Sequence, residues 1–205
     1  MISYTHQRKN CGLAAIEFAL ILPVLLLLAL AVFDFSRAMQ AKLIVINVSR
    51  EGASLAARSS LEYSNQQIMN ALTASTPPLN MASFGMIYIT KIMGVSQQGA
   101  VRNVVVEQYR WAQGYNQNHY APSSSVWNCG SSAGTWASDG SCQNIPSPGP
   151  SAPTANVMTN QLNNGDLIYA VEVFYNFQTV FSGRTFGTGI TIPQIGPTLD
   201  AMTVM

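Results

Sequence analysis

Hydrophobic residues along this chain are concentrated in one N-terminal run. Residues 13–33 read LAAIEFALILPVLLLLALAVF and contain a single charge, Glu17. A run of about 20 apolar residues can cross the hydrocarbon core of a bilayer as an α-helix. The pattern therefore predicts a transmembrane helix over residues 13–33. Pro23 is the expected kink site, because proline removes one helix hydrogen bond; the sequence leaves open whether the kink assists subunit packing or is merely tolerated.

The pattern beyond residue 33 is that of an amphipathic helix. Residues 33–58 contain no proline, and apolar side chains recur at spacings of mostly three or four. We therefore expect one helix over residues 13–58, roughly 70 Å long at 1.5 Å per residue. We expect Gly52 to bend or end it. Its sheet-packing stripe is expected to consist of Phe35, Met39, Leu43, Ile46, Ala53 and Ala57.

Alternating and continuous apolar segments in the rest of the chain predict a small antiparallel sheet. A short helix at 61–72 should end before Pro77 and Pro78. The sequence therefore predicts an α+β fold, with the long N-terminal helix laid on the sheet. The expected strands are 84–93, 103–111 and 167–177, with a fourth short strand near 189–192.

Residues 112–166 form a long Ser/Gly/Pro-rich loop insertion. It contains Cys129 and Cys142, and we expect them to form a disulfide, stabilising by about 3 kcal/mol through loop closure. The alternative is two exposed free thiols. Its aromatic residues either form an exposed ligand-binding surface or cover the sheet edge as a small satellite core, and we favour the core. These residues are Trp111, directly before the segment, and Tyr115, Tyr120, Trp127 and Trp136 within it.

Composition and charge argue against several functions. Charged residues are 9% of the chain, against roughly 25% in an average soluble domain, which favours an exposed protein outside the cytoplasm. The formal net charge of +1 provides no basic surface for nucleic acid. The two histidines, His6 and His119, have no metal-ligand spacing around them, and no catalytic motif is present. We therefore expect no enzymatic activity and no cofactor or metal.

The charges around the apolar run predict its orientation. Residues 1–12 contain Arg8 and Lys9 and no acid, which favours a cytoplasmic N-terminus. Asp34 follows on the far side, so residues 34–205 become an extracytoplasmic domain whose cysteines can oxidise. A secretory signal peptide releasing a protein from Val32 is the alternative. It is less favoured because this run exceeds the usual 7–15 residues and contains an acid.

The boundary between the polar segment and the apolar run lies close to Glu17. Cleavage between Gly12 and Leu13 would give Leu13 a new α-amine and discard Cys11. Glu17 would then lie at i+4 from that amine, on the same helix face, where the two charges can neutralise each other. The alternative is that Glu17 lies at the membrane interface without a partner.

These residues carry a resemblance to a known family. Gly12, Ile16, Glu17, Phe18, Ala19, Leu20 and Pro23, followed by leucines, resemble the start of TadE-like proteins, the pseudopilins of tight-adherence (type IVc, Flp) pili. Residues 50–53, Arg-Glu-Gly-Ala, resemble the second signature of this family. The resemblance covers residues 12–58, and residues 112–166 look like an insertion specific to this protein.

The resemblance implies a pilin-like fold and a minor pilin cleaved after Gly12 by a prepilin peptidase. The processing site would consist of Gly12, Leu13, Glu17 and Phe18. Expected partners are other pilins, the peptidase and the inner-membrane assembly platform, with the chain as a single-pass protein of the inner membrane. The alternative is a secreted or membrane-tethered adhesin that uses the 112–166 loop.

Overall fold

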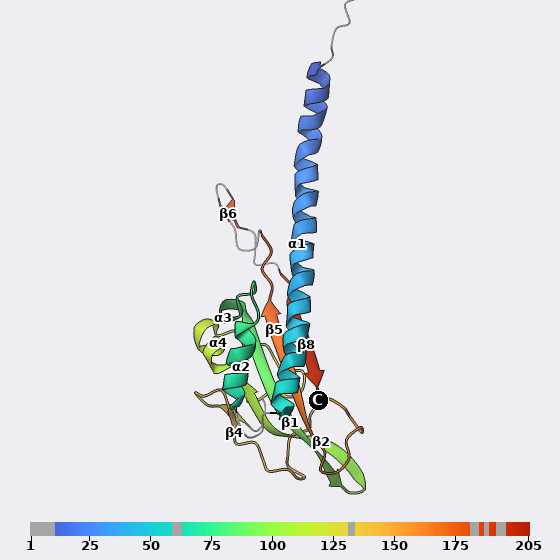
Figure 1. Cartoon of the computed structure of the whole chain (residues 1–205), viewed down its shortest axis with the longest axis vertical. Coiled ribbons are helices and arrows are strands. Elements are labelled where there is room, and N and C mark those ends of the chain that lie inside the picture. Colours follow the sequence, from blue (N-terminus) through green and yellow to red (C-terminus); the bar gives the residue numbers. More distant parts are fainter. Residues whose placement is uncertain (1–10, 59–62, 131–133, 181–184, 187–188, 192–195) are drawn as a thin grey trace, which may run out of the picture.

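The chain folds into one long helix laid against a small sheet (Figure 1). The computed structural model describes all residues except 1–10, 59–62, 131–133, 181–184, 187–188 and 192–195. Helix α1, Cys11–Arg58, has 48 residues and continues through Pro23. Its first half stands clear of the folded domain and its second half lies on the sheet. The expected α+β class is therefore confirmed.

The central sheet is antiparallel and has four strands in the order β2-β1-β5-β8. Three of the strands were expected, while β8 at the C-terminus was not. The strands are β1 (Gly85–Gln97), β2 (Ala100–Arg110), β5 (Leu167–Asn176) and β8 (Thr198–Val204).

The fourth expected strand lies elsewhere. Residues Ile190–Thr191 do form a strand, β7, but it pairs with β6 (Thr185–Phe186) in a separate two-stranded sheet. Ile192 lies outside the described residues. The edge of the central sheet is formed instead by β8, which hydrogen-bonds to β5. Its side chains are half-buried or exposed, and the sequence LDAMTV has no strong apolar alternation.

The short helices have clear local causes. Helix α2, Asn65–Ala74, begins after Ser64, which forms a capping box with Gln67. It ends before the Pro77-Pro78 pair, as expected. Helices α3 (Met81–Phe84) and α4 (Ala112–Asn118) were not expected from the sequence.

The sheet-facing side of α1 differs from the expected stripe. Phe35, Met39 and Leu43 are 69%, 51% and 59% exposed, and Ala57 is exposed as well, so the prediction that these four pack on the sheet was wrong. Ala53 is buried, as predicted. The helix packs through smaller side chains because these allow its axis to approach the strands closely. Its buried face consists of Ala41, Val45, Val48, Ser49, Gly52, Ala53 and Ala56.

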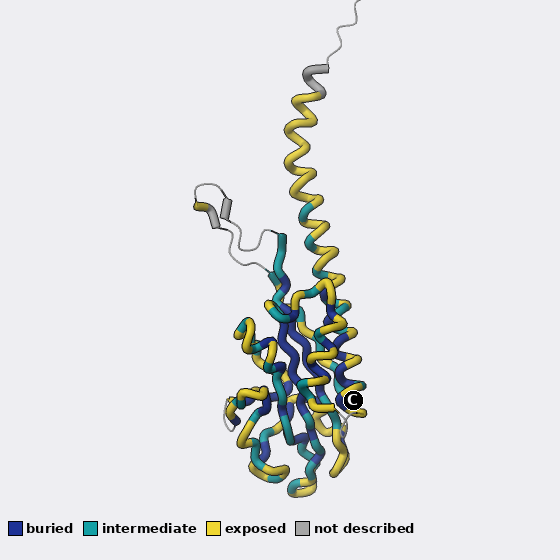
Figure 2. The backbone as a smooth tube through the Cα atoms, turned by 60° about the vertical axis from the view of Figure 1, so that its left-hand side comes forward, coloured by how far each residue is buried: buried dark blue, intermediate teal, exposed yellow. Residues whose placement is uncertain are grey.

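Both faces of the central sheet are covered, and the middle strands β1 and β5 are therefore buried over most of their length, with exposed residues only near one end of each (Figure 2). In β5, Val171 faces α1 and lies next to Gly52. The neighbouring Glu172 faces the opposite way and contacts Ser124 and Ser125 of the insertion. The 112–166 insertion is thus a second layer on the sheet rather than a loop that extends into solvent.

Candidate functional site

The predicted processing residues lie in the first turns of α1. Gly12 and Leu13 are helical, and their side chains lie outside what the structure describes. Glu17 and Phe18 are exposed, and Glu17 has no ion pair among the described residues. The predicted pairing of Glu17 with a Leu13 amine requires a cleaved chain, and it stays a prediction.

The helix beyond these residues is apolar and uncovered. Every residue from Ala15 to Ala29 is exposed. Within Ala15–Arg58 the most apolar 18-residue window has a mean hydropathy of 2.8, and none of that window is buried. Among the described residues this is the one helix long and apolar enough to cross a membrane. It is compatible with a single-pass anchor. Arg8 and Lys9, which predict its orientation, lie outside the described residues.

The end of the apolar run is followed by a set of contacts between α1 and the folded domain. The backbone N–H of Val180 donates to both carboxylate oxygens of Asp34, each at 3.1 Å. Arg37 Nη1 lies 3.3 Å from Asp34 Oδ1. The Arg37 guanidinium also lies 5.8 Å from the ring centre of Phe33 and 5.5 Å from that of Phe177. These contacts fasten the helix to the segment that follows β5.

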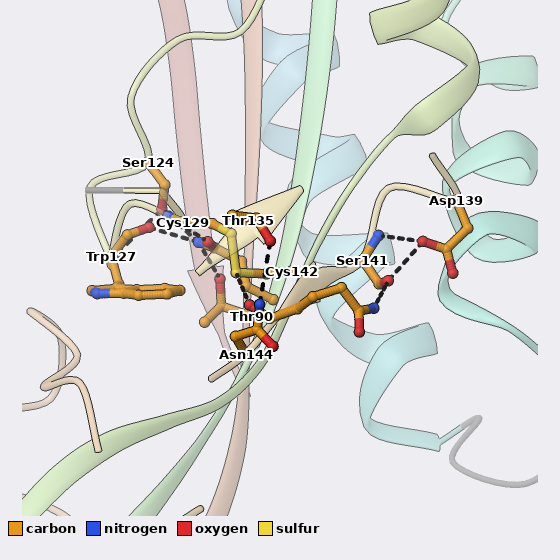
Figure 3. Close-up of a disulfide and its surroundings, with 11 residues drawn as sticks. Thr90, Ser124, Trp127, Cys129, Thr135, Asp139, Ser141, Cys142 and Asn144 are labelled. Atoms are coloured by element: carbon orange, nitrogen blue, oxygen red, sulfur yellow. Dashed lines mark hydrogen bonds between the residues drawn. A yellow bond between two sulfur atoms is a disulfide. The ribbon is translucent and has the colours of Figure 1, made fainter. Parts of the chain in front are cut away.

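The two cysteines that the sequence pairs are bonded in the structure (Figure 3). Cys142 begins the short strand β4 (Cys142–Gln143), and Cys129 lies in the preceding loop, with 6.0 Å between their Cα atoms. A Cβ at Gly134 would collide with both sulfur atoms, so only glycine fits there. The disulfide closes the part of the insertion that lies on the sheet.

Two buried polar side chains fix this segment to the sheet. Gln108 of β2 donates through Nε2 to the carbonyl of Trp127 at 2.6 Å, and its Oε1 accepts the N–H of Cys129 at 3.2 Å. Glu172 accepts the N–H of Ser125 at 2.7 Å and the hydroxyl of Ser124. Burial raises the pKa of Glu172, and these hydrogen bonds oppose that rise. Both residues were missed from the sequence, where the one available signal was a polar residue inside an apolar strand.

The aromatic residues of the insertion form a core. Trp111 and Trp127 are buried, with 3% and 9% exposed. Arg110 of β2 lies over the rings of Tyr115 and Trp136, at 3.5 and 4.9 Å from their centres. Trp127 belongs to a second buried cluster with Val105 and Cys129, as the satellite-core interpretation expects. Trp111 lies instead in the main core with α1, and Tyr115 and Tyr120 pack against that main core, so for these three the expected separate core was wrong.

The residues that the structure describes bring no metal-binding cluster together. These residues contain no cluster of three or more His, Cys, Asp or Glu side chains suited to a metal ion. His119, expected as a loop residue, ends α4 with a φ of 52° and stacks edge-on against Tyr115; His6 lies outside the described range. The N-terminal end of α1 and the disulfide-bearing insertion lie far apart (Figure 1).

The fold is therefore that of an α+β protein with one long N-terminal helix, whose first half is exposed and apolar enough to cross a membrane and whose second half packs on the sheet. The model of the TadE-like protein family matches residues 12–54. The chain therefore carries the TadE-like segment that its sequence resemblance indicated. The match contains Gly12, Glu17 and most of the sheet-packing face of α1, and it ends before α2. No curated protein and no solved structure matches the chain.

Proposed function

We propose that this chain is a minor pilin of a tight-adherence (type IVc) pilus, with a structural rather than an enzymatic role. Residues 13–33 would span the inner membrane, and residues 34–205 would lie outside the cytoplasm. The observation that carries this proposal is the exposed apolar half of α1 within a TadE-like segment. A wholly exposed apolar surface of this length requires lipid or other helices to cover it.

Maturation would remove residues 1–12 through cleavage after Gly12 by a prepilin peptidase. The new amine of Leu13 would lie one helical turn from Glu17, within reach of its carboxylate. Phe18 is 61% exposed on the same helix and would complete the processing site. Neutralisation of the carboxylate lowers its free-energy penalty in an apolar environment.

Contacts with other pilins would use the side of α1 that the sheet leaves free. Phe35, Met39 and Leu43 are spaced four residues apart, and all three are exposed. These three side chains extend the exposed apolar surface of α1 beyond Phe33. Packing of this surface against a different surface of the next subunit is a heterologous contact, which builds a filament rather than a closed ring. The assembly platform would supply the subunits.

N-terminal sequencing of the chain recovered from membranes and from sheared pili tests this proposal. Leu13 as the first residue is expected, and Gly12→Leu should leave the chain uncleaved. A first residue of Val32 would indicate a signal peptide and a secreted protein, and an intact Met1 a permanent anchor. No observation favours the adhesin alternative, because Trp111 and Trp127 of the insertion region are buried.

A further inference from the structure

A cavity of about 280 Å³ lies between α1, the segment before α3 and the end of β5. Its lining combines one cation, side-chain amides and aromatic rings. Asp34, the ion-pair partner of the cation, is not among the lining residues. The lining includes Arg37, Gln40, Asn80, Phe84, Tyr175 and Phe177.

Arg37 retains hydrogen-bonding capacity at this cavity. Its ion pair with Asp34 involves Nη1, whereas a guanidinium has five N–H donors. Burial raises the pKa of Tyr175, and a hydrogen bond with the backbone of Asn80 and the charge of Arg37 oppose that rise. Asn80 uses its Oδ1 to accept the N–H of Ser83 at 3.1 Å, which leaves its NH₂ group to donate.

The cavity lies at a defined distance from the apolar run. Arg37 follows Phe33 by four residues, which is about 6 Å along the helix axis. Headgroups add roughly 5–7 Å to each side of a hydrocarbon core of about 30 Å. If residues 13–33 span the core, Arg37 and the end of the cavity that it lines lie in the headgroup layer.

We propose that this cavity binds the phosphate of a membrane phospholipid through Arg37. The inference rests on the proposed membrane placement of residues 13–33. A guanidinium binds a phosphate through two parallel hydrogen bonds, and the amides of Gln40 and Asn80 supply further donors. A lipid fits better than a soluble phosphate, because the acyl chains attached to the phosphate can lie along the exposed apolar side chains of the proposed membrane-spanning segment, up to Phe33.

The test uses the full chain in nanodiscs of phosphatidylethanolamine and phosphatidylglycerol, followed by mild detergent extraction and native mass spectrometry. The wild-type chain should retain one phospholipid, and Arg37→Gln should lower the retained fraction at least fivefold. Gln40→Trp should lower it as well by filling the cavity while leaving Arg37 in place. Arg50→Gln removes an exposed cation of the same helix outside the cavity, and it should retain the lipid.

Four results would overturn the proposal. The first is a wild-type chain that enters nanodiscs and retains no lipid, which leaves the proposed function untouched. The second is an equal loss in Arg50→Gln, which indicates diffuse charge attraction. The third is displacement of the lipid by millimolar inorganic phosphate, which indicates a soluble anion. The fourth is a chain that does not enter nanodiscs, which also removes the membrane placement and with it the proposed function.

Discussion

Gly52 of α1 lies so close to Val171 of β5 that a Cβ on Gly52 would be 3.0 Å from Val171 Cγ1. The same Cβ would be 2.9 Å from Leu72 Cδ1 of α2. The helix continues past this glycine to Arg58, so Gly52 neither ends nor breaks it. Its role is to allow α1 to approach the sheet and α2 together.

Gly52→Val should therefore destabilise the fold by about 1–3 kcal/mol, the usual range for overpacking. The added methyl groups would force Val171 and Leu72 to move, which outweighs the gain in helix propensity. The change in the free energy of unfolding can be measured by urea unfolding of the full chain in detergent, monitored by tryptophan fluorescence. Ala57→Val, at an exposed position of the same helix, is the control and should change stability by less than about 0.7 kcal/mol. Equal effects would contradict the close-approach explanation.

Periodicity was sufficient to predict α1 and three strands, but it could not identify which side of α1 packs. Both flanks of the helix carry apolar residues, and the larger ones, such as Phe35 and Leu43, have the stronger hydrophobic signal. The side of α1 that packs is instead the one whose small residues, such as Ala41 and Gly52, allow a short distance between the helix axis and the sheet. That selection depends on the partner surface and not on the hydrophobicity of the helix itself.

The rest of the site depends on contacts between distant segments. Gln108 and Glu172 are single polar residues within apolar strands, and their hydrogen-bond partners come from the insertion. The strand β8 has a weak pattern because one of its edges is unpaired in the central sheet. The disulfide was predictable, since Cys129 and Cys142 are the two cysteines of the predicted extracytoplasmic domain.

Glu172→Gln should remove one component of the pH dependence of stability. Burial raises the pKa of Glu172 above its usual value of 4.5. Its contribution is therefore complete below about pH 4.5 and is lost as the pH rises towards the folded-state pKa. A glutamine can still accept the N–H of Ser125 and donate to Ser124, so the fold should persist.

Urea unfolding at pH 4–8 tests this expectation. The wild-type chain should lose stability relative to Glu172→Gln as the pH rises above about 4.5. Glu51→Gln, which changes an exposed acid of α1, should keep the wild-type slope. Parallel curves for the wild type and Glu172→Gln would show that ionisation of Glu172 does not oppose folding.

Reduction of the disulfide should destabilise the insertion. Cys129 and Cys142 are 13 residues apart in sequence, and loop-closure entropy gives roughly 3 kcal/mol for a loop of this size. Unfolding of Cys142→Ser, compared with the wild type in the presence and absence of reductant, measures this contribution. Reductant should lower the free energy of unfolding of the wild type and should not change that of Cys142→Ser. Alkylation without reduction should label the precursor once, at Cys11, and the mature chain not at all.

Glu17→Ala should spare cleavage after Gly12 but reduce assembly. Glu17 is exposed, and it is the one charged residue between Ala15 and Ala29 of α1. Its carboxylate is therefore the group available to pair with a Leu13 amine. Loss of the pair would leave that amine without a partner in an apolar environment. N-terminal sequencing measures cleavage, and electron microscopy of sheared pili measures assembly.

Two further variants distinguish the effect of losing the Glu17 charge from the general effect of shortening a side chain in this helix. Glu17→Asp keeps a carboxylate on a shorter side chain, and it should restore part of the assembly that Glu17→Ala loses. Leu27→Ala shortens an exposed apolar residue of the same helix, and its pili should be close to wild type in number. Wild-type numbers of pili in Glu17→Ala would exclude the pairing, because assembly would then proceed with an unneutralised amine at Leu13.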